Sequence, residues 1–291
     1  MDYLGHALKQ ILVTGASGYL GKHILSMLRM KGVDALGVGR AVGCDIVCNL
    51  NDQAATNDLI ARHPGCRIIH CAAVVPKSRP DYLDEGRAAE SLSMVRNLAA
   101  AGPRYIVFVS SMTVYPEGTL LAREDEAVPT GKGYAGSKFQ AERVLLEREG
   151  ITATILRLPG LFGLPRRGGV LFNSALALAR GETPTLDAAL PQWAGLHVED
   201  AAEICVRAAT VSPADSMVLN AGYPERMAIS TAVAQLAALF GRELTVPSPK
   251  WFEFDLSRLH RVLGPVAGRF SDRLNDLADW ARVEVGNVRH A

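Results

Sequence analysis

Short apolar runs alternate with longer amphipathic runs along the first half of the chain. The apolar runs fall at residues 10–15, 33–39, 66–73, 104–111 and 151–160. Runs with helical spacing fall at residues 18–32, 85–102 and 133–150. The apolar runs do not alternate with polar residues, which is expected of strands covered on both faces. The pattern predicts an α/β fold with a doubly wound parallel sheet of the Rossmann type.

After about residue 158 the alternation loosens. Residues 160–169 are rich in Gly and Pro and carry two Arg, which predicts a loop. Residues 188–210 return to a strand and a helix, and three further helical runs lie at residues 229–241, 254–264 and 272–283. We expect a smaller, interleaved C-terminal lobe for the substrate. The dinucleotide-binding domain would then be residues 1–158 with 190–222 returning to it, and the substrate lobe mainly residues 159–189 and 223–291.

Composition narrows the function classes. The 291 residues are 48% hydrophobic and 21% charged with a net charge of +1, which gives no reason to expect a nucleic-acid or membrane partner. The sequence shows no run of the ~18 apolar residues that a spanning helix needs. It also shows no signal peptide in its first ten residues, so we expect a cytoplasmic protein. The five Cys form no C-x-x-C pair, and we expect reduced thiols and no metal site.

A glycine-rich turn follows the first predicted strand. Gly15, Gly18 and Gly21 have the spacing G-x-x-G-x-x-G between a strand and a helix. Gly15 permits a tight turn, Gly18 lets a pyrophosphate approach the free N–H groups of the helix, and Gly21 allows close helix–strand packing. No Gly-Lys-Ser/Thr follows, which argues against a phosphate-loop NTPase. The turn predicts a dinucleotide site.

The end of the second predicted strand bears on the choice of dinucleotide. It ends "LGVGR", with Arg40 where an acid would hold a ribose 2′-hydroxyl, and with no acid before Asp45. A guanidinium suits a 2′-phosphate. We therefore favour NADP, with NAD as the alternative.

Tyr134 and Lys138 are four residues apart in a predicted helix, and Ser110 and Ser111 end a predicted strand. Residues i and i+4 share a helix face, so the Lys ammonium would lie near the phenol and lower its pKa. A Ser hydroxyl at the carboxyl end of a parallel strand would hold a carbonyl oxygen while Tyr134 protonates it. We expect an acid–base site made of a Tyr, a Lys and a Ser.

With these motifs the chain resembles the extended short-chain dehydrogenase/reductases of the NAD-dependent epimerase/dehydratase type. "TGASGYLG", "SSMTVYP" and "YAGSK" are similar to the family's TGxxGxxG, SSxxVYG and YxxxK. The resemblance makes Ser111, Tyr134 and Lys138 the catalytic residues and implies a homodimer. The residues expected at the cofactor are Gly15, Ser17, Gly18, Tyr19, Leu20, Gly21, Arg40, Asn49, Leu50, Cys71, Ala72, Ala73, Ser110, Tyr134, Lys138, Leu158 and Pro159.

The departures from the family pattern concern the substrate. Gly160 stands where nucleotide-sugar enzymes carry an Asn, and Trp193 replaces their Arg ahead of "HV". Arg166 and Arg167 are candidates to bind a diphosphate instead, and Trp193 is a candidate to stack on a ring. The substrate-binding residues that we expect are Ser111, Thr113, Gly160, Arg166 and Trp193.

Several functions remain open. The preferred one is a reductase of a 4-keto sugar nucleotide. The alternatives are a nucleotide-sugar epimerase that holds NAD tightly, a dehydrogenase of a sugar acid or small hydroxy compound, and a non-catalytic NADP-sensing protein. Dehydratases of the family usually carry Asp-Glu where this chain has Met112-Thr113, so dehydration is disfavoured.

Overall fold

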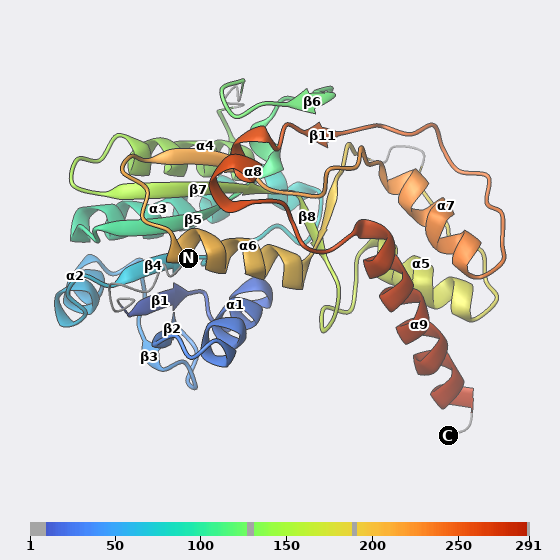
Figure 1. Cartoon of the computed structure of the whole chain (residues 1–291), viewed down its shortest axis with the longest axis horizontal. Helices are drawn as coiled ribbons and strands as arrows, with labels where there is room; N and C mark the ends of the chain where they lie inside the picture. The colour runs from blue at the N-terminus through green and yellow to red at the C-terminus, as the bar shows by residue number, and fades with distance from the viewer. Residues whose placement is uncertain (1–9, 127–130, 188–190, 290–291) are drawn as a thin grey trace.

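The computed structural model describes residues 10–126, 131–187 and 191–289, and its centre is a seven-stranded sheet in which all neighbouring strands run parallel (Figure 1). The order is β10-β7-β5-β4-β1-β2-β3. The strands are β1 (Ile11–Thr14), β2 (Ala35–Gly39), β3 (Ile46–Val47), β4 (Arg67–His70), β5 (Tyr105–Ser111), β7 (Thr152–Leu158) and β10 (Met217–Asn220). The predicted doubly wound parallel sheet is confirmed.

Helices cover both faces of this sheet. They are α1 (Tyr19–Met30) and α6 (Val198–Thr210) on one face, and α2 (Gln53–Arg62), α3 (Glu85–Ala101) and α4 (Gly133–Leu146) on the other. Successive residues of β1 show the two-sided burial, because Ile11 and Val13 pack with Ile24 of α1, whereas Leu12 packs with Leu98 of α3. All are fully buried. This explains why the strands read as unbroken apolar runs.

Local signals set the limits of the longest helix on the sheet. The Asp84 carboxylate accepts a hydrogen bond from the backbone N–H of Arg87 at 3.1 Å, which caps the start of α3. Gly102 ends the helix in the left-handed conformation with φ 71°, which costs glycine little. The predicted helix at residues 85–102 is therefore confirmed, and it leads into β5, whose far end lines the site.

A second group of helices lies beyond the ends of the strands. It consists of α5 (Val170–Ala179), α7 (Ile229–Leu239) and α9 (Phe270–Arg289), which lie together at the right of Figure 1. Two small parallel sheets join this group to the core: β8 (Gly160–Phe162) with β9 (Gly195–His197), and β6 (Leu121–Ala122) with β11 (Glu253–Phe254). Two 3₁₀ turns, η1 (Pro80–Leu83) and η2 (Met112–Val114), and helix α8 (Ser257–Leu263) complete the fold.

Residues 160–169 differ in part from the sequence prediction, which gave a loop throughout. Residues 160–162 form β8, whose Gly160 N–H donates to the carbonyl of Ala194 at 3.0 Å. Glycine is rare in strands, so composition pointed to a loop, but the flat indole of Trp193 lies against Gly160 and its strand partner Gly195. Contacts with a residue 33 positions away decide the conformation here.

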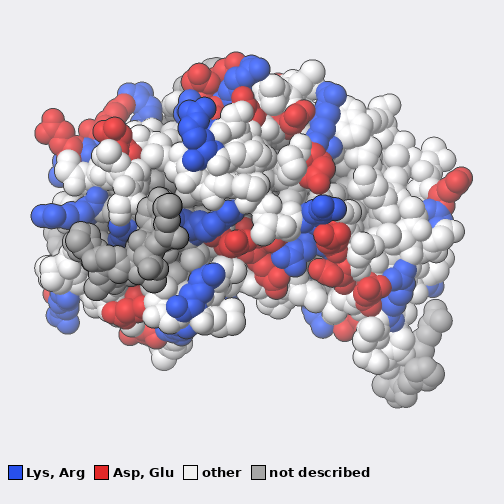
Figure 2. All heavy atoms as spheres, in the orientation of Figure 1, with Lys and Arg blue, Asp and Glu red and all other residues white. Residues whose placement is uncertain are grey.

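None of the helices in the described ranges combines the length and apolar character needed to cross a membrane. The cytoplasmic location stays a prediction, and residues 1–9, on which it partly depends, lie outside the described residues, as do 188–190 of the predicted lobe boundary. On the face drawn in Figure 2, acidic and basic side chains are interspersed rather than gathered by sign.

Candidate active site

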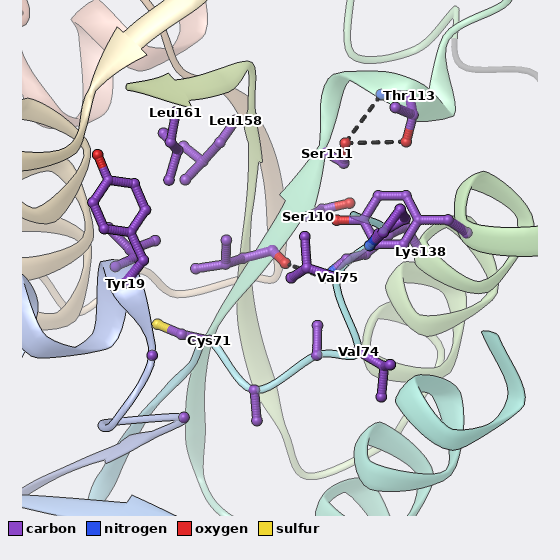
Figure 3. Close-up of a pocket in the computed structure, with 18 of the residues that line it drawn as sticks. Tyr19, Cys71, Val74, Val75, Ser110, Ser111, Thr113, Lys138, Leu158 and Leu161 are labelled. Carbon is purple, nitrogen blue, oxygen red and sulfur yellow. Dashed lines mark hydrogen bonds between the residues drawn. The ribbon is translucent and has the colours of Figure 1, made fainter. Parts of the chain in front are cut away.

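A cavity of about 1480 Å³ lies at the carboxyl ends of the central strands, where the chain leaves β1 and β4 in opposite directions. Open parallel sheets bind ligands at such a point. Of the residues predicted for catalysis, cofactor or substrate, all but Arg167 line this cavity, and Figure 3 draws part of the lining. The fold thus brings residues between positions 15 and 193 to the lining of a single cavity.

The glycine turn forms one end of the cavity. Gly15 has φ 70°, and a Cβ added there would lie 2.7 Å from the backbone nitrogen of Ala72, so only glycine fits. A Cβ on Gly21 would lie 2.2 Å from the carbonyl oxygen of Gly15, which shows how closely α1 packs on the turn. The first turn of α1 holds no acidic residue, and its leading N–H groups lack helical partners. This end suits an anion.

The region after β2 contains Arg40, which lines the cavity. Its Nη1 lies 3.1 Å from Oε1 of Glu90 in α3, and the two side chains are 69% and 38% exposed. Asp45, the next acid, does not line the cavity. Its Oδ2 accepts the Gly37 N–H and an Arg29 N–H, each at 2.5 Å. The nearest carboxylate downstream of β2 is therefore engaged elsewhere.

The catalytic candidates line the same cavity. Ser111 ends β5, and its Oγ accepts hydrogen bonds from the backbone N–H and the hydroxyl of Thr113, at 3.2 and 3.0 Å (Figure 3). Tyr134 lies in the first turn of α4 and lines the cavity, with its phenol near enough to the Ser111 side chain for that group to oppose the rise in its pKa. Lys138 follows one turn later, and its Nζ lies 5.7 Å from the centroid of the Tyr134 ring. The predicted Ser, Tyr and Lys are thus brought together.

The pKa of Tyr134 departs from the sequence expectation. Burial raises it and the Ser111 side chain opposes that rise, whereas we expected Lys138 to lower it. The ammonium of Lys138 instead donates to the carbonyl of Val109 at 2.7 Å. Burial lowers the pKa of Lys138 to about 8, partly opposed by Cys71 and Glu142. The expected direction was wrong because the sequence did not reveal how deeply both groups are buried.

A buried polar network, which the sequence analysis missed, includes Glu142, whose charge favours the charged form of Lys138 and so partly opposes the fall in its pKa caused by burial. Ser110, expected at the cofactor, lines the cavity, but its hydroxyl donates to the carboxylate of Glu142. Glu142 also pairs with Arg157 of β7 and stands four residues after Lys138. Arg157 continues the network by donating to the hydroxyl of Tyr115 at 2.9 Å. The i, i+4 spacing of Lys138 and Glu142 was the available signal.

The other end of the cavity is built around Trp193. A Cβ on Gly160 would lie 2.2 Å from the indole Nε1, and a Cβ on Gly195 would lie 2.2 Å from the far edge of the ring. The indole therefore lies flat on two paired glycines. Sequence reasoning missed several lining residues at this end and along the loop after β4: Val75, Pro76, Lys77, Arg79, Tyr82, Glu117, Gln192 and Phe252.

The loop after β4 could have been found by rule, since it leaves the carboxyl end of a central strand. Its 3₁₀ turn η1 packs against the start of α4: a Cβ on Gly133 would lie 2.1 Å from the Tyr82 carbonyl oxygen. The Tyr82 ring meets the Tyr134 ring edge-on with centroids 5.7 Å apart. This loop therefore contributes one wall beside the candidate acid.

The two adjacent arginines of the 163–169 segment point to different places. Arg166 lines the cavity, with its guanidinium carbon 5.9 Å from the centroid of the Tyr19 ring. Arg167 is not among the lining residues and pairs with Glu284 of α9 at 2.9 Å. Of the two candidates for binding a diphosphate, only Arg166 remains.

Comparison with known proteins gives a family match over most of the chain. The model of the NAD dependent epimerase/dehydratase family matches residues 11–222. Methionine adenosyltransferase 2 subunit beta is similar: the Danio rerio protein is 32% identical over 161 residues, covering 53% of this chain and 49% of that protein. The Xenopus laevis protein is 31% identical over 215 residues, covering 68% and 61%. The chain thus spans about half to three fifths of these relatives.

Other similar proteins carry sugar-nucleotide names. UDP-glucose 4-epimerase of Azospirillum brasilense is 27% identical over 274 residues, covering 81% of this chain and 78% of that protein. The structure of UDP-N-acetylglucosamine 4-epimerase from Bacillus cereus has a TM-score of 0.78 at 20% identity, covering 94% and 96%. MoeE5 in complex with UDP-glucose and NAD has a TM-score of 0.79 at 23% identity, covering 95% and 99%. At these identities the two structures establish a shared fold.

Proposed function

The chain belongs to the NAD-dependent epimerase/dehydratase family, and from this premise we propose that it is an NAD(P)-dependent oxidoreductase acting at a carbonyl or hydroxyl carbon. The observation that carries the proposal is the meeting of Ser111, Tyr134 and Lys138 in a cavity that the glycine turn and Trp193 also line. A dinucleotide at the turn and a substrate on the indole would both reach this point.

The described residues fit a dinucleotide. The glycine turn packs so tightly that added Cβ atoms would collide with the backbone. Because no side chain stands at these positions, a phosphate can approach the N–H groups at the start of α1. The charged residues among those lining the cavity are mostly cationic. They are Arg40, Lys77, Arg79, Lys138 and Arg166, against Glu117. Glu90 and Asp187, outside the lining, offset the charges of Arg40 and Arg79, and the remaining cations favour a ligand with negative charge.

The chemistry of the protein's own groups follows from their contacts. A bound nicotinamide would supply or accept the hydride. Ser111 would hold the reacting oxygen, and Tyr134 would donate its proton to that oxygen or remove one from it. The raised pKa of Tyr134 keeps the phenol protonated at neutral pH, which suits an acid for carbonyl reduction. Lys138, charged below about pH 8, would stabilise the phenolate left behind.

We propose NADP as the preferred dinucleotide. Arg40 lines the cavity after β2, and Asp45, the first acid beyond it, is bound to Arg29 and to the Gly37 N–H. A 2′-phosphate would thus meet a guanidinium and no free carboxylate from this segment. NAD stays the alternative, since MoeE5 is described with NAD.

For the substrate we propose a 4-keto sugar nucleotide, which the enzyme would reduce. The cationic lining and the names of the similar epimerases support a nucleotide sugar. Epimerisation is the alternative that those names favour. Dehydrogenation of a sugar acid or small hydroxy compound is a third, favoured by the Trp193 indole, which fills the space beside Gly160 where a larger polar side chain would stand.

Turnover separates these reactions. A reductase consumes one NADPH per substrate, whereas an epimerase converts its substrate with no cofactor added. In either case Tyr134→Phe should lower kcat by about 10²- to 10⁴-fold while dinucleotide binding is retained. Tyr82→Phe is the matched control, because it removes the hydroxyl group from the neighbouring ring that packs on Tyr134. Full activity in Tyr134→Phe would overturn the proposed mechanism.

A second candidate function comes from the curated relatives named as a subunit of methionine adenosyltransferase 2. By analogy with that name, this chain would act as a subunit of a larger assembly, and as the NADP-sensing protein considered above it would bind NADP without turnover. Such a protein would bind NADPH yet oxidise it with none of a panel of ketones and aldehydes.

We also propose a homodimer and the division into the sheet domain and the C-terminal lobe. Sedimentation of the purified chain tests the first of these.

A further inference from the structure

A hydrogen bond joins the glycine turn to the segment after β8. The Tyr19 hydroxyl donates to the carbonyl of Gly163 at 2.6 Å, across 144 residues of sequence. Tyr19 is the first residue of α1, immediately after Gly18. Gly163 has φ 112°, and a Cβ there would lie 2.3 Å from Nε2 of His197. Gly163 is therefore held between the start of α1 and the end of β9.

This bond fixes where the next residues of the segment lie. Arg166, three residues after Gly163, places its guanidinium carbon 5.9 Å from the centroid of the Tyr19 ring and lines the cavity. In Figure 3, Tyr19 lies on the opposite side of the view from Lys138. Arg166 therefore lies beside the ring of the residue that follows Gly18 in the glycine turn.

Arg167 shows that this placement is specific to one of two neighbouring arginines. Its Nη1 pairs with Oε1 of Glu284 at 2.9 Å, and its guanidinium carbon lies 5.8 Å from the Trp280 ring. Both partners belong to α9. Arg166 is exposed, and its charge acts on Tyr19, where it opposes the rise in pKa caused by burial. One arginine is thus committed to the lobe and the other faces the cavity beside α1.

The chemistry of the two sides is complementary. The start of α1 offers backbone N–H groups and the positive end of a helix dipole to one side of a phosphate group. A guanidinium offers a planar fork of N–H donors that matches phosphate oxygens. A pyrophosphate has oxygens on both sides, so it can be held by the helix from one side and by the fork from the other.

We propose that Arg166 binds the pyrophosphate of the dinucleotide from the side opposite the glycine turn. The inference rests on the proposed function for the presence of a dinucleotide, and it makes Arg166 a cofactor residue where the sequence suggested a substrate residue. Tyr19 ties the same segment to α1, so Arg166 is already placed beside the start of that helix.

The test is direct binding of dinucleotides to the full chain, measured by isothermal titration calorimetry without turnover. Arg166→Gln should weaken NADP⁺ and NAD⁺ alike, by about 10- to 100-fold, since each loses a hydrogen bond between charged groups. Arg167→Gln is the matched control and should bind both as the wild type does. Adenosine 2′,5′-bisphosphate, which lacks the pyrophosphate, should bind equally to wild type and Arg166→Gln.

Arg166→Lys keeps the charge without the fork and should give an intermediate loss, with circular dichroism confirming that each variant is folded. Tyr19→Phe should weaken both dinucleotides by a smaller factor than Arg166→Gln. If Arg166→Gln binds both dinucleotides as the wild type does and only the KM for substrate rises, Arg166 belongs to the substrate and the proposal is wrong. If the wild type itself binds neither dinucleotide, the proposed function fails, which is a different result.

Discussion

Glu142 and Arg157 form an ion pair inside the protein, with Oε2 and Nη2 2.7 Å apart and side chains 1% and 3% exposed. The pair joins α4, which carries Tyr134 and Lys138, to β7, which leads into β8. Its remaining hydrogen-bonding groups are also satisfied, by Ser110 on one side and by Tyr115 on the other. The pair therefore links the candidate catalytic helix to the strand beside it.

Removing one partner should be costly. Glu142→Ala leaves a buried guanidinium without its counter-ion, and the free energy of unfolding should fall by about 3–5 kcal/mol in urea denaturation. Glu147→Ala is the matched control, at the C-terminal cap of the same helix. It removes the exposed partner of Arg143, 2.6 Å away, and should cost less than about 1 kcal/mol. Equal effects of the two substitutions would contradict the structural role of the buried pair.

The lowered pKa of Lys138 predicts a pH dependence of stability. Its pKa is about 8 in the folded chain against 10.5 for the ordinary group, so between these values the unfolded chain binds more protons. The free energy of unfolding should therefore rise with pH across this window, relative to Lys138→Met, by up to about 3 kcal/mol. Denaturation at pH 7.5, 8.5 and 9.5 measures the difference, and a constant difference would mean that Lys138 titrates normally.

The contact of Trp193 with Gly160 predicts non-additive substitutions. Gly160→Ala places a methyl group 2.2 Å from the indole Nε1, so the ring must move, at a cost of about 1–3 kcal/mol of stability. In a Trp193→Ala background the same substitution should cost little. A double-mutant cycle in urea measures this coupling. Gly86→Ala is the control, because its Cβ would come no nearer than 3.3 Å to a carboxylate oxygen. Additive effects would show that the indole adapts freely.

The pairing of Arg40 with Glu90 predicts opposite effects on NADP affinity. Arg40→Gln should weaken NADP⁺ by about tenfold or more and leave NAD⁺ within about twofold, because only a 2′-phosphate needs the guanidinium. Glu90→Gln should tighten NADP⁺, since it releases Arg40 from the ion pair at 3.1 Å. Titration with both dinucleotides gives the ratio. An equal loss for both after Arg40→Gln would contradict the assignment.

Features encoded by short-range spacing were predictable from the sequence. The glycine turn needs three glycines at fixed intervals, and Tyr134 and Lys138 need only a shared helix face. The parallel sheet followed from unbroken apolar runs between helices. In each case the physical cause lies within one element or one turn, so residues close in the sequence carry it.

Features that depend on contacts between distant segments were not predictable. The indole of Trp193 packs against Gly160 and leaves no room for a side chain there, and Arg157 of β7 neutralises the charge of Glu142 in α4. From the sequence we expected Lys138 to lower the pKa of Tyr134. Burial raises it instead, and this burial is set by the packing of η1 and β5 around the phenol, which the sequence did not reveal. Burial and pairing across the sheet are properties of the folded chain rather than of a motif.

The small sheet of β6 and β11 has a consequence for changing the cavity lining in the laboratory. Phe252, beyond the family-matched region, precedes β11 and lines the cavity as Glu117 does, while Gln192 ties the turn at residues 116–119 to the carbonyl of Trp251 at 2.8 Å. Positions 116, 117, 192 and 252 therefore form a spatially contiguous set drawn from three stretches of the gene. A mutagenic library confined to these four codons diversifies this part of the lining and leaves Tyr134 and the glycine turn intact.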